Sequence, residues 1–365
     1  MRARPLLLRA VALAGLGLAL LTAPVAASAS CRDTTGVGGE GRVRWTEAVA
    51  PENEAALEAW CVAVGGPVLI EPPVARATLD PVEVFAALAW NLHVGDGDLE
   101  RLIRRLQAGE LTEGRPVEHF VLLLQEAARV GPAVPASGVP GAISASAIGS
   151  PIDASRSIEA FADRNGLYGF YAPSMRNGPD HREDRGNAIL STLPLTDPAA
   201  LVLPYERQRR VAIAATVSLT LHHGESRSLR VVSAHFDNSS RLGRIWRSFG
   251  AGRVRQARAL ADWLDSEQAV ALGGDFNTWW DGSKEDAVLL LRERFPLPQV
   301  LPIHATYQPP FSMPRRQADY LLFRLPEGWT ADYEADSDWG GSDHAPLIGW
   351  METGGRDVAA PAEGN

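Results

Sequence analysis

The chain has 365 residues, of which 45% are hydrophobic and 22% charged, a composition that is ordinary for a globular protein with a substantial core. Its formal charge of −9 at pH 7 argues against a protein that coats nucleic acid through overall positive charge. A nuclease remains compatible with this charge, because cleavage of nucleic acid needs only a local basic surface.

The first 30 residues have the pattern of a secretory signal peptide. Arginines at positions 2, 4 and 9 precede an apolar stretch at residues 10–21, and small residues follow it. This stretch is too short and wrongly flanked for a membrane span. We therefore expect export to the periplasm or the cell exterior, with cleavage near residues 27–30 and no transmembrane span in the mature chain. An uncleaved membrane anchor is the alternative.

Cys31 and Cys61, the only two cysteines of the sequence, follow this segment directly. In an oxidising compartment they are most simply explained as one disulfide, which closes a loop of about 30 residues and contributes about 3–4 kcal/mol. Lipid attachment at Cys31 is the alternative, although lipoprotein signals carry a large aliphatic residue where this chain has Ser28. We interpret residues 31–74 as an N-terminal extension that is too short to bury much core alone.

From residue 75 to residue 351 we expect a single domain in which strands alternate with helices. Short apolar runs at residues 84–90 and 118–125 predict buried strands. Between them, Asp98 is a candidate N-cap for a surface helix whose apolar face carries residues 99, 102, 103 and 106.

Further strands are predicted downstream, at residues 186–195, 209–221, 229–236, 268–276 and 318–325, and a last one after residue 346. A helix is predicted at residues 253–268, and residues 352–365 are expected to be a disordered tail. The sequence HHGES joins the strands at 209–221 and 229–236, which are therefore most simply antiparallel. This favours two packed sheets with helices outside over a doubly wound parallel sheet.

Polar side chains gather at the ends of these predicted strands. Each has an ordinary structural explanation when taken alone, such as a turn cap, a solvated carboxylate or a core histidine. Their number in one chain is harder to explain in that way, because a sheet edge concentrates strand ends in space. The residues are Asn91, Gln125, Glu126, Asn187, His235, Asp237, Asn238, Asp275, Asn277, Asp319, Ser342, Asp343 and His344.

Eight short motifs contain these residues: WNLH, LLLQEA, RGNAILS, RRVAIAATV, SAHFDN, GGDFNTW, ADYLLF and GSDHAPL. In this order they resemble the successive motifs of the endonuclease/exonuclease/phosphatase superfamily. That superfamily includes DNase I-like nucleases, abasic-site endonucleases, neutral sphingomyelinases and inositol polyphosphate phosphatases. The resemblance spans about residues 86–350. It implies a four-layer α/β sandwich, in which two mixed β-sheets pack face to face with helices outside.

The resemblance also implies a metal site. Glu126 matches the family's main Mg²⁺ ligand, Asn91 lies at the same metal, and Asp343 is a candidate for the metal side. A carboxylate with an amide and waters suits Mg²⁺, which prefers oxygen ligands and keeps much of its hydration shell. Mn²⁺ is the alternative ion.

The catalytic roles follow from the same resemblance. His344 matches the histidine that activates water or binds the phosphoryl oxygen, and Asp319 matches the acid that orients it. His235 matches a second histidine, which protonates the leaving group or contacts the phosphate. Asp275 and Asn277 match the pair that positions the attacking water and the phosphate. Which of these groups is the general base stays open.

The substrate is less well defined. Arg185 and Asn187 are candidate substrate contacts. The segment ADY stands where inositol phosphatases carry CDR, which argues against that branch. Six arginines at residues 241, 244, 247, 253, 255 and 258, with Trp246 and Phe249 among them, could line a phosphate-binding groove. A solvated helix face is the other explanation of this run. The tryptophans at 279 and 280 we interpret as packing residues.

The sequence therefore predicts an exported, monomeric, Mg²⁺-dependent phosphodiesterase that uses a water activated by a His–Asp pair. Nucleic acid is the expected substrate. A sphingomyelinase-like lipid phosphodiesterase is the first alternative, and a non-catalytic binding module on the same fold is the second.

Overall fold

The computed structural model describes residues 31–32, 35–37, 42–73, 81–82, 84–136, 138, 151–179, 181–221, 224–238, 250–279, 282, 284–309 and 313–352. The expected signal peptide, the expected tail after residue 352, and the arginines at 241, 244 and 247 lie outside these residues. So do Trp246, Phe249 and Trp280.

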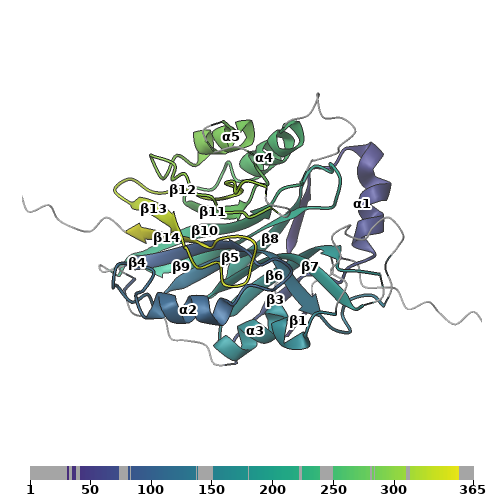
Figure 1. Ribbon diagram of the computed structural model, residues 1–365, viewed down its shortest axis with the longest axis horizontal. Coiled ribbons are helices and arrows are strands. Elements are labelled where there is room, and N and C mark those ends of the chain that lie inside the picture. The colour runs from purple at the N-terminus through teal and green to yellow at the C-terminus, as the bar shows by residue number, and fades with distance from the viewer. Residues whose placement is uncertain are drawn as a thin grey trace, which may run out of the picture.

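Two mixed β-sheets lie face to face at the centre of the molecule (Figure 1). The first has the order β1 (Thr35–Val37), β3 (Val68–Ile70), β6 (Tyr168–Arg176), β7 (Glu183–Ser191), β5 (Phe120–Val130), β4 (Val84–Asn91), β14 (Leu347–Glu352) and β13 (Thr330–Ala335). The second has the order β12 (Asp319–Arg324), β11 (Val270–Asp275), β10 (Ser226–His235), β9 (Val211–Thr220), β8 (Thr196–Val202) and β2 (Arg44–Glu47). The pairs β4–β5 and β10–β11 are parallel, whereas β9–β10 and β11–β12 are antiparallel.

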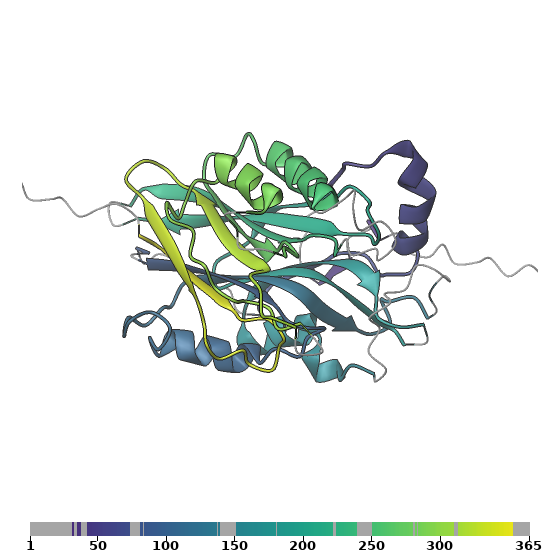
Figure 2. The same ribbon diagram turned by 45° about the horizontal axis from the view of Figure 1, so that its top comes forward.

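Helices cover the outer face of each sheet (Figure 2). Helices α2 (Leu99–Gln107) and α3 (Ile158–Asn165) pack on the first sheet, and α4 (Ala251–Trp263) and α5 (Asp286–Arg294) pack on the second. Helix α1 (Glu54–Cys61) lies at one end of the molecule. The four-layer α/β sandwich is thereby confirmed.

The alternation of side chains along β4 explains why this strand is apolar throughout. Its odd-numbered residues Phe85, Ala87 and Ala89 belong to the core between the sheets. Its even-numbered residues pack instead against the side of α2 and α3. Successive side chains of a strand point to opposite faces, so a strand covered on both sides has no polar face.

Several predicted elements are confirmed. Asp98 caps α2, because its Oδ1 accepts a hydrogen bond of 2.9 Å from the backbone N–H of Arg101. The antiparallel pairing of the strands around HHGES is confirmed as β9–β10. The predicted helix at 253–268 is α4, which begins at Ala251 and ends at Trp263.

One predicted strand is wrong in its extent. The sequence predicts a single strand at residues 186–195, but β7 ends at Ser191 and β8 begins at Thr196. The two strands belong to different sheets, so the chain crosses from one sheet to the other between them. The Ser191 hydroxyl accepts a hydrogen bond of 2.9 Å from the backbone N–H of Leu193 and stabilises this turn.

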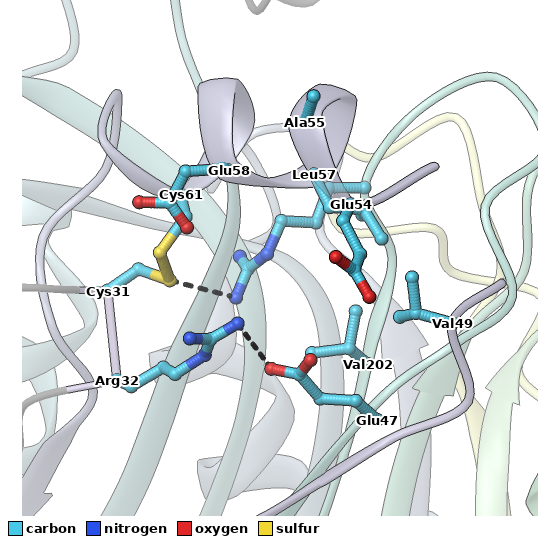
Figure 3. A pocket seen from close by; sticks show the side chains of 11 residues that line it. Cys31, Arg32, Glu47, Val49, Glu54, Ala55, Leu57, Glu58, Cys61 and Val202 are labelled. Carbon is cyan, nitrogen blue, oxygen red and sulfur yellow. Dashed lines mark hydrogen bonds and ion pairs between the residues drawn. A yellow bond between two sulfur atoms is a disulfide. The ribbon is translucent and has the colours of Figure 1, made fainter. Parts of the chain in front are cut away.

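The described part of residues 31–74 is joined to both sheets. Strand β2 pairs with β8, and β3 pairs with β6. A disulfide links Cys31 and Cys61 with a Cα–Cα distance of 5.1 Å, which confirms the predicted bond and leaves no free thiol at Cys31. A cavity of about 440 Å³ lies beside this disulfide (Figure 3). None of the described helices is long and apolar enough to cross a membrane.

Candidate functional site

Two glycines precede Asp275 at the end of β11, and they let this strand lie close to β4 of the facing sheet and to β10 of its own sheet. A Cβ atom on Gly273 would lie 2.7 Å from the Cβ atom of Ala89 in β4 of the facing sheet. A Cβ atom on Gly274 would lie 2.1 Å from the carbonyl oxygen of Ala234 in β10. Real side chains do not fit at such distances, so Gly273 allows the two sheets to meet at this point and Gly274 allows β11 to lie close to β10.

Asp275 is the centre of the resulting cluster and is only 2% exposed. Its Oδ2 accepts a hydrogen bond of 3.0 Å from Asn91 Nδ2 and lies 3.3 Å from His235 Nε2 and 3.8 Å from His344 Nε2. Its Oδ1 accepts a hydrogen bond of 2.8 Å from the backbone N–H of Asn277. Burial opposes ionisation of Asp275, but the two histidines outweigh it and hold its pKa well below the usual range.

His344 is paired with a carboxylate. Its Nδ1 lies 2.8 Å from Asp319 Oδ2, and Asp319 is 1% exposed. Burial opposes protonation of His344, but Asp319 and Asp275 outweigh it and raise the pKa of His344 to about 10. His344 is therefore an imidazolium at neutral pH, with one N–H directed to Asp319 and the other toward Asp275.

His235 is paired with an arginine instead. Its Nδ1 lies 3.0 Å from Nη1 of Arg210. A guanidinium only donates hydrogen bonds, so Nδ1 accepts and the proton of this imidazole lies on Nε2, facing Asp275. Burial and the charge of Arg210 together lower the pKa of His235. The two histidines around Asp275 are thus held in opposite protonation states.

Glu126 leaves the regular path of β5 at a bulge. The pairing of β5 with β7 shifts register between Leu124 and Ala127, and Glu126 has a φ of 50°. Its Oε2 lies 3.0 Å from Arg185 Nη1. Burial opposes ionisation of Glu126, but Arg185, His235 and neighbouring groups outweigh it and lower its pKa. A non-glycine residue keeps this backbone conformation only where its surroundings impose it, as they often do at functional sites.

Asp343 and Asn91 are linked through His93. Asp343 Oδ1 lies 3.1 Å from His93 Nδ1 and 3.9 Å from His344 Nε2. The backbone N–H of His93 donates a hydrogen bond of 3.0 Å to Asn91 Oδ1. Asp343 is the main cause of the raised pKa of His93, to which Glu126 also contributes. Of the three predicted metal ligands, Asp343 therefore contacts the His93 side chain, Asn91 contacts its backbone, and Glu126 acts on it through charge.

A different group of predicted residues lies close enough to hold an ion. One ligand atom each from Asp275, Asp319 and His344 lies within 4.8 Å of the other two. The Nδ1 atom of His344 is already bonded to Asp319, so this trio is better explained as a hydrogen-bonded acid–base cluster than as a complete metal site.

The remaining predicted residues have different surroundings. Asn277 has a φ of 51° and donates through Nδ2 to the carbonyl oxygen of Phe236 at 3.0 Å, next to His235. Asn187 is 1% exposed, and its Nδ2 donates to the carbonyl oxygens of Val211 and Ser233. These carbonyls belong to the second sheet, so Asn187 joins the two sheets, and no described contact links it to Asp275 or its histidines.

Of the arginine run that could line a phosphate-binding groove, two described members are paired within the protein, and a third, Arg258, is exposed on α4. Arg253 is 2% exposed and lies 3.1 Å from Glu285, and Arg255 lies 2.5 Å from Glu206. Both belong to α4 and their charges are balanced. The groove is therefore not supported by these two residues.

Three residues of the site, Arg210, Tyr307 and His93, were not predicted from the sequence. Arg210 lies in the motif RRVAIAATV, but arginine is so common in this chain that single arginines carry little signal. The ring of Tyr307 lies 4.5 Å from that of His344 and covers it, and it belongs to an irregular segment that no periodicity marks. His93, the third missed residue, follows Asn91 in the motif WNLH.

The cavity beside the disulfide is a separate feature. Its lining includes Arg32, Glu47 and Glu58, and Arg32 pairs with Glu47 across it (Figure 3). None of the predicted catalytic or metal residues lines it. This cavity takes no part in the site around Asp275.

Solved structures resemble the chain in fold. An endonuclease/exonuclease/phosphatase from Beutenbergia cavernae matches at a TM-score of 0.50 and 19% identity, over 76% of this chain and 74% of that chain. The 3′ phosphatase NExo from Neisseria, bound to a product DNA hairpin, matches at 0.44 and 18%, over 72% and 98%. A Cimex nitrophorin in a ferrous NO complex matches at 0.37 and 10%, over 75% and 100%. No family model and no curated protein matches the chain.

Of these likenesses, the one to the Beutenbergia cavernae structure reaches a TM-score of 0.50, and at 19% identity it shows the fold alone. It agrees with the two mixed sheets and the outer helices found in this chain. The protein therefore has the α/β sandwich fold of the endonuclease/exonuclease/phosphatase structures.

Proposed function

We propose that the protein is an exported, Mg²⁺-dependent phosphoester hydrolase, a phosphodiesterase that acts on nucleic acid. The observation that carries the proposal is Asp275, which lies between a protonated His344 and a neutral His235. Titratable groups whose environments push their pKa values apart are typical of enzymes that move protons at neutral pH. The fold shared with an endonuclease/exonuclease/phosphatase supports this reaction class.

Asn91, Glu126 and Asp343 would hold the metal ion. Their donor atoms are oxygens, which Mg²⁺ and Mn²⁺ accept readily. Glu126 and Asp343 both lie close enough to His93 to raise its pKa, so their negative charges share one neighbourhood. The bound ion would neutralise phosphate charge and stabilise the transition state.

The side chains around Asp275 would have separate roles in the hydrolysis. In hydrolysis, a water oxygen forms a bond to phosphorus and gives its proton to a base, while the bond from phosphorus to the leaving oxygen breaks and that oxygen takes a proton from solvent. Because His344 is already protonated, the predicted His–Asp pair cannot be this base. Asp275, which is ionised before the reaction, orients the water together with Asn277 and accepts its proton. His344 donates from Nε2 to a phosphoryl oxygen, where negative charge grows in the transition state. His235 donates from its Nε2–H to the phosphate, while Asp319 positions His344.

Arg185 supports this arrangement through Glu126. Its Nη1 holds Glu126 Oε2 at 3.0 Å, so the arginine positions the carboxylate and adds positive charge near the phosphate. Asn187, in contrast, acts by joining the sheets beneath the site. We therefore assign Arg185 to the substrate side and Asn187 to the scaffold.

The decisive experiment compares Glu126→Gln with Glu118→Gln, an exposed glutamate that precedes the same strand and serves as the matched control. Hydrolysis of bis-p-nitrophenyl phosphate in Mg²⁺ should fall about 100-fold or more in Glu126→Gln and stay unchanged in the control. EDTA should abolish the wild-type activity and added Mg²⁺ should restore it. Full activity in EDTA, or equal activity of the two variants, would contradict the proposal.

A lipid phosphodiesterase is the alternative, and one observation favours it. The sequence predicts that Trp279 is a packing residue, but this tryptophan is 36% exposed. An exposed tryptophan near the site could enter a membrane surface. Release of choline from sphingomyelin vesicles, measured beside cleavage of plasmid DNA, separates the two substrates.

The remaining features of the proposal concern processing and assembly. We propose that residues 1–30 are the signal peptide, that residues 75–351 form the catalytic domain and that the mature chain is a monomer. The disulfide supports export, because disulfides persist in oxidising compartments.

A further inference from the structure

Beyond the cluster around Asp275, one wall of the site is built from alternating aromatic and arginine side chains. We call it the arginine–aromatic row, and it consists of Trp279, Tyr307, Arg315, Arg316 and Trp339. Its central segment folds back on itself, since Tyr307 pairs with Arg316 and also with His344 through antiparallel bridges. The row therefore begins directly at a proposed catalytic residue.

Ring contacts run outward from His344 along this row. The Tyr307 ring lies 4.5 Å from the His344 ring, and the guanidinium of Arg316 lies 4.8 Å from the centre of the Tyr307 ring. The same guanidinium lies 4.2 Å from the centre of the Trp279 ring. On the other side, Arg315 lies 4.9 Å from the centre of the Trp339 ring.

The two arginines of the row are not held in close ion pairs, and Arg315 donates from Nε to Oε1 of Gln308 at 2.8 Å. Within the described part of the chain, neither Arg315 nor Arg316 has a carboxylate within 4.0 Å, in contrast to the paired Arg253 and Arg255 of α4. The Nε–H of Arg316 is buried and has no hydrogen-bond partner among the described residues. A buried donor without a partner costs free energy, which a bound anion would recover.

The geometry also restricts what Arg316 can bind. Two aromatic rings cover the guanidinium and hold it in one orientation, so it offers the N–H groups at its edge. Those groups suit phosphate oxygens. Trp279 lies against Arg316 and still exposes 36% of its surface, which leaves an aromatic area on which a nucleobase can stack.

We propose that the arginine–aromatic row binds a single-stranded polynucleotide next to the scissile phosphodiester, with Arg316 on the flanking phosphate and Trp279 under a base. This inference rests on the proposed function, because it extends the substrate beyond the reacting phosphate. A choline lipid fits the row less well, since its headgroup has one phosphate and carries a cation that Arg315 and Arg316 would repel.

The proposed role of the arginine–aromatic row is tested by two separate measurements, oligonucleotide binding and substrate cleavage. Arg316→Met removes the charge, and Arg104→Met is the matched control, since Arg104 is an exposed arginine on α2. In EDTA, which prevents the proposed cleavage, a fluorescent oligothymidylate of about ten nucleotides should bind Arg316→Met about tenfold more weakly at low salt. A plot of the logarithm of the binding constant against the logarithm of the salt concentration should have a slope that is shallower by about 0.7 in this variant. This is the value for the loss of one phosphate contact in a single strand. Arg104→Met should bind as the wild type does.

In Mg²⁺, Arg316→Met should raise KM for the oligonucleotide about tenfold and lower hydrolysis of bis-p-nitrophenyl phosphate far less, because that substrate has no flanking phosphate, whereas Arg104→Met should leave both activities unchanged. Trp279→Leu should weaken oligonucleotide binding as well. Three results would contradict the proposed role of the arginine–aromatic row. They are unchanged oligonucleotide binding in Arg316→Met, an equal loss of activity on both substrates, and binding of sphingomyelin vesicles in preference to the oligonucleotide. If the wild type cleaves neither substrate but binds the oligonucleotide through Arg316, the row stands and the proposed hydrolysis fails.

Discussion

The Nδ2 atom of Asn91 lies 3.0 Å from Oδ2 of Asp275, and this hydrogen bond joins the two β-sheets at the candidate site. Asn91 ends β4 of the first sheet, and Asp275 ends β11 of the second. The site therefore exists only where the sheets are packed in this register. A change at either residue should affect activity more than stability.

Asn91→Ala tests this relationship. The variant loses the donor to Asp275 and the acceptor for the backbone N–H of His93, so we expect kcat on bis-p-nitrophenyl phosphate to fall about 100-fold. The free energy of unfolding should fall by about 1–3 kcal/mol, because a buried polar group is left without its partner. Steady-state kinetics and urea denaturation measure the two effects. Unchanged kcat would show that the bond only holds the sheets together.

Protonation of the two histidines can be observed directly in the metal-free protein. Because Asp319 and Asp275 raise the pKa of His344 to about 10, His344 should carry protons on both nitrogens at pH 8. His235, whose pKa is lowered by burial and by Arg210, should carry one, on Nε2. Nitrogen-15 NMR of the imidazoles measures this. In Asp319→Asn, His344 should lose a proton at a lower pH, and a His344 that titrates near its ordinary pKa in the wild type would refute the assignment.

A buried ion pair fastens the N-terminal extension to the first sheet. Arg129 and Asp184 are 1% and 0% exposed, and their Nε and Oδ1 atoms lie 2.9 Å apart. The same two side chains bond the backbone of Gly65 and Gly66. Asp184→Ala leaves the Arg129 charge buried without a partner, so the free energy of unfolding should fall by about 3–5 kcal/mol. Glu118→Gln is the exposed control, and a loss below about 1 kcal/mol would contradict the role of the pair.

The disulfide should contribute to stability and not to catalysis. Replacing both Cys31 and Cys61 by Ala should lower the free energy of unfolding by about 3–4 kcal/mol, the entropy of closing a loop of about 30 residues. Activity at 25 °C should be retained, because the disulfide and its cavity share no lining residue with the cluster around Asp275. Loss of activity in a variant that is still folded by circular dichroism would connect this end of the molecule to the site.

Much of the fold was predictable because its signals are local. The apolar runs of β4 and β5 and the helical spacing after Asp98 identify these elements from a few neighbouring residues. Strand β6 was missed, since its sequence YGFYAPSMR contains Gly and Pro and alternates poorly. Helices α3 and α5, of 8 and 9 residues, were missed as well, because such short helices give a weak periodic signal.

The candidate site was predictable in its residues but not in its connections. Asp275 ends one predicted strand, Asp319 begins another, and His344 precedes the last one. His235 ends β10 and its partner Arg210 lies just before β9, and no local pattern indicates which arginine pairs with the histidine. The backbone of Glu126 depends on a bulge in β5, which arises from the pairing with β7. The exposure of Trp279 likewise depends on its packing against Arg316.

The central claim is that Asp275 organises phosphoester hydrolysis, and Asp275→Asn tests it most directly. This change keeps the side-chain shape and removes the charge between the two histidines. We expect kcat/KM for bis-p-nitrophenyl phosphate in Mg²⁺ to fall about 1,000-fold or more while circular dichroism shows an unchanged fold. Hydrolysis at the wild-type rate by Asp275→Asn would contradict the account.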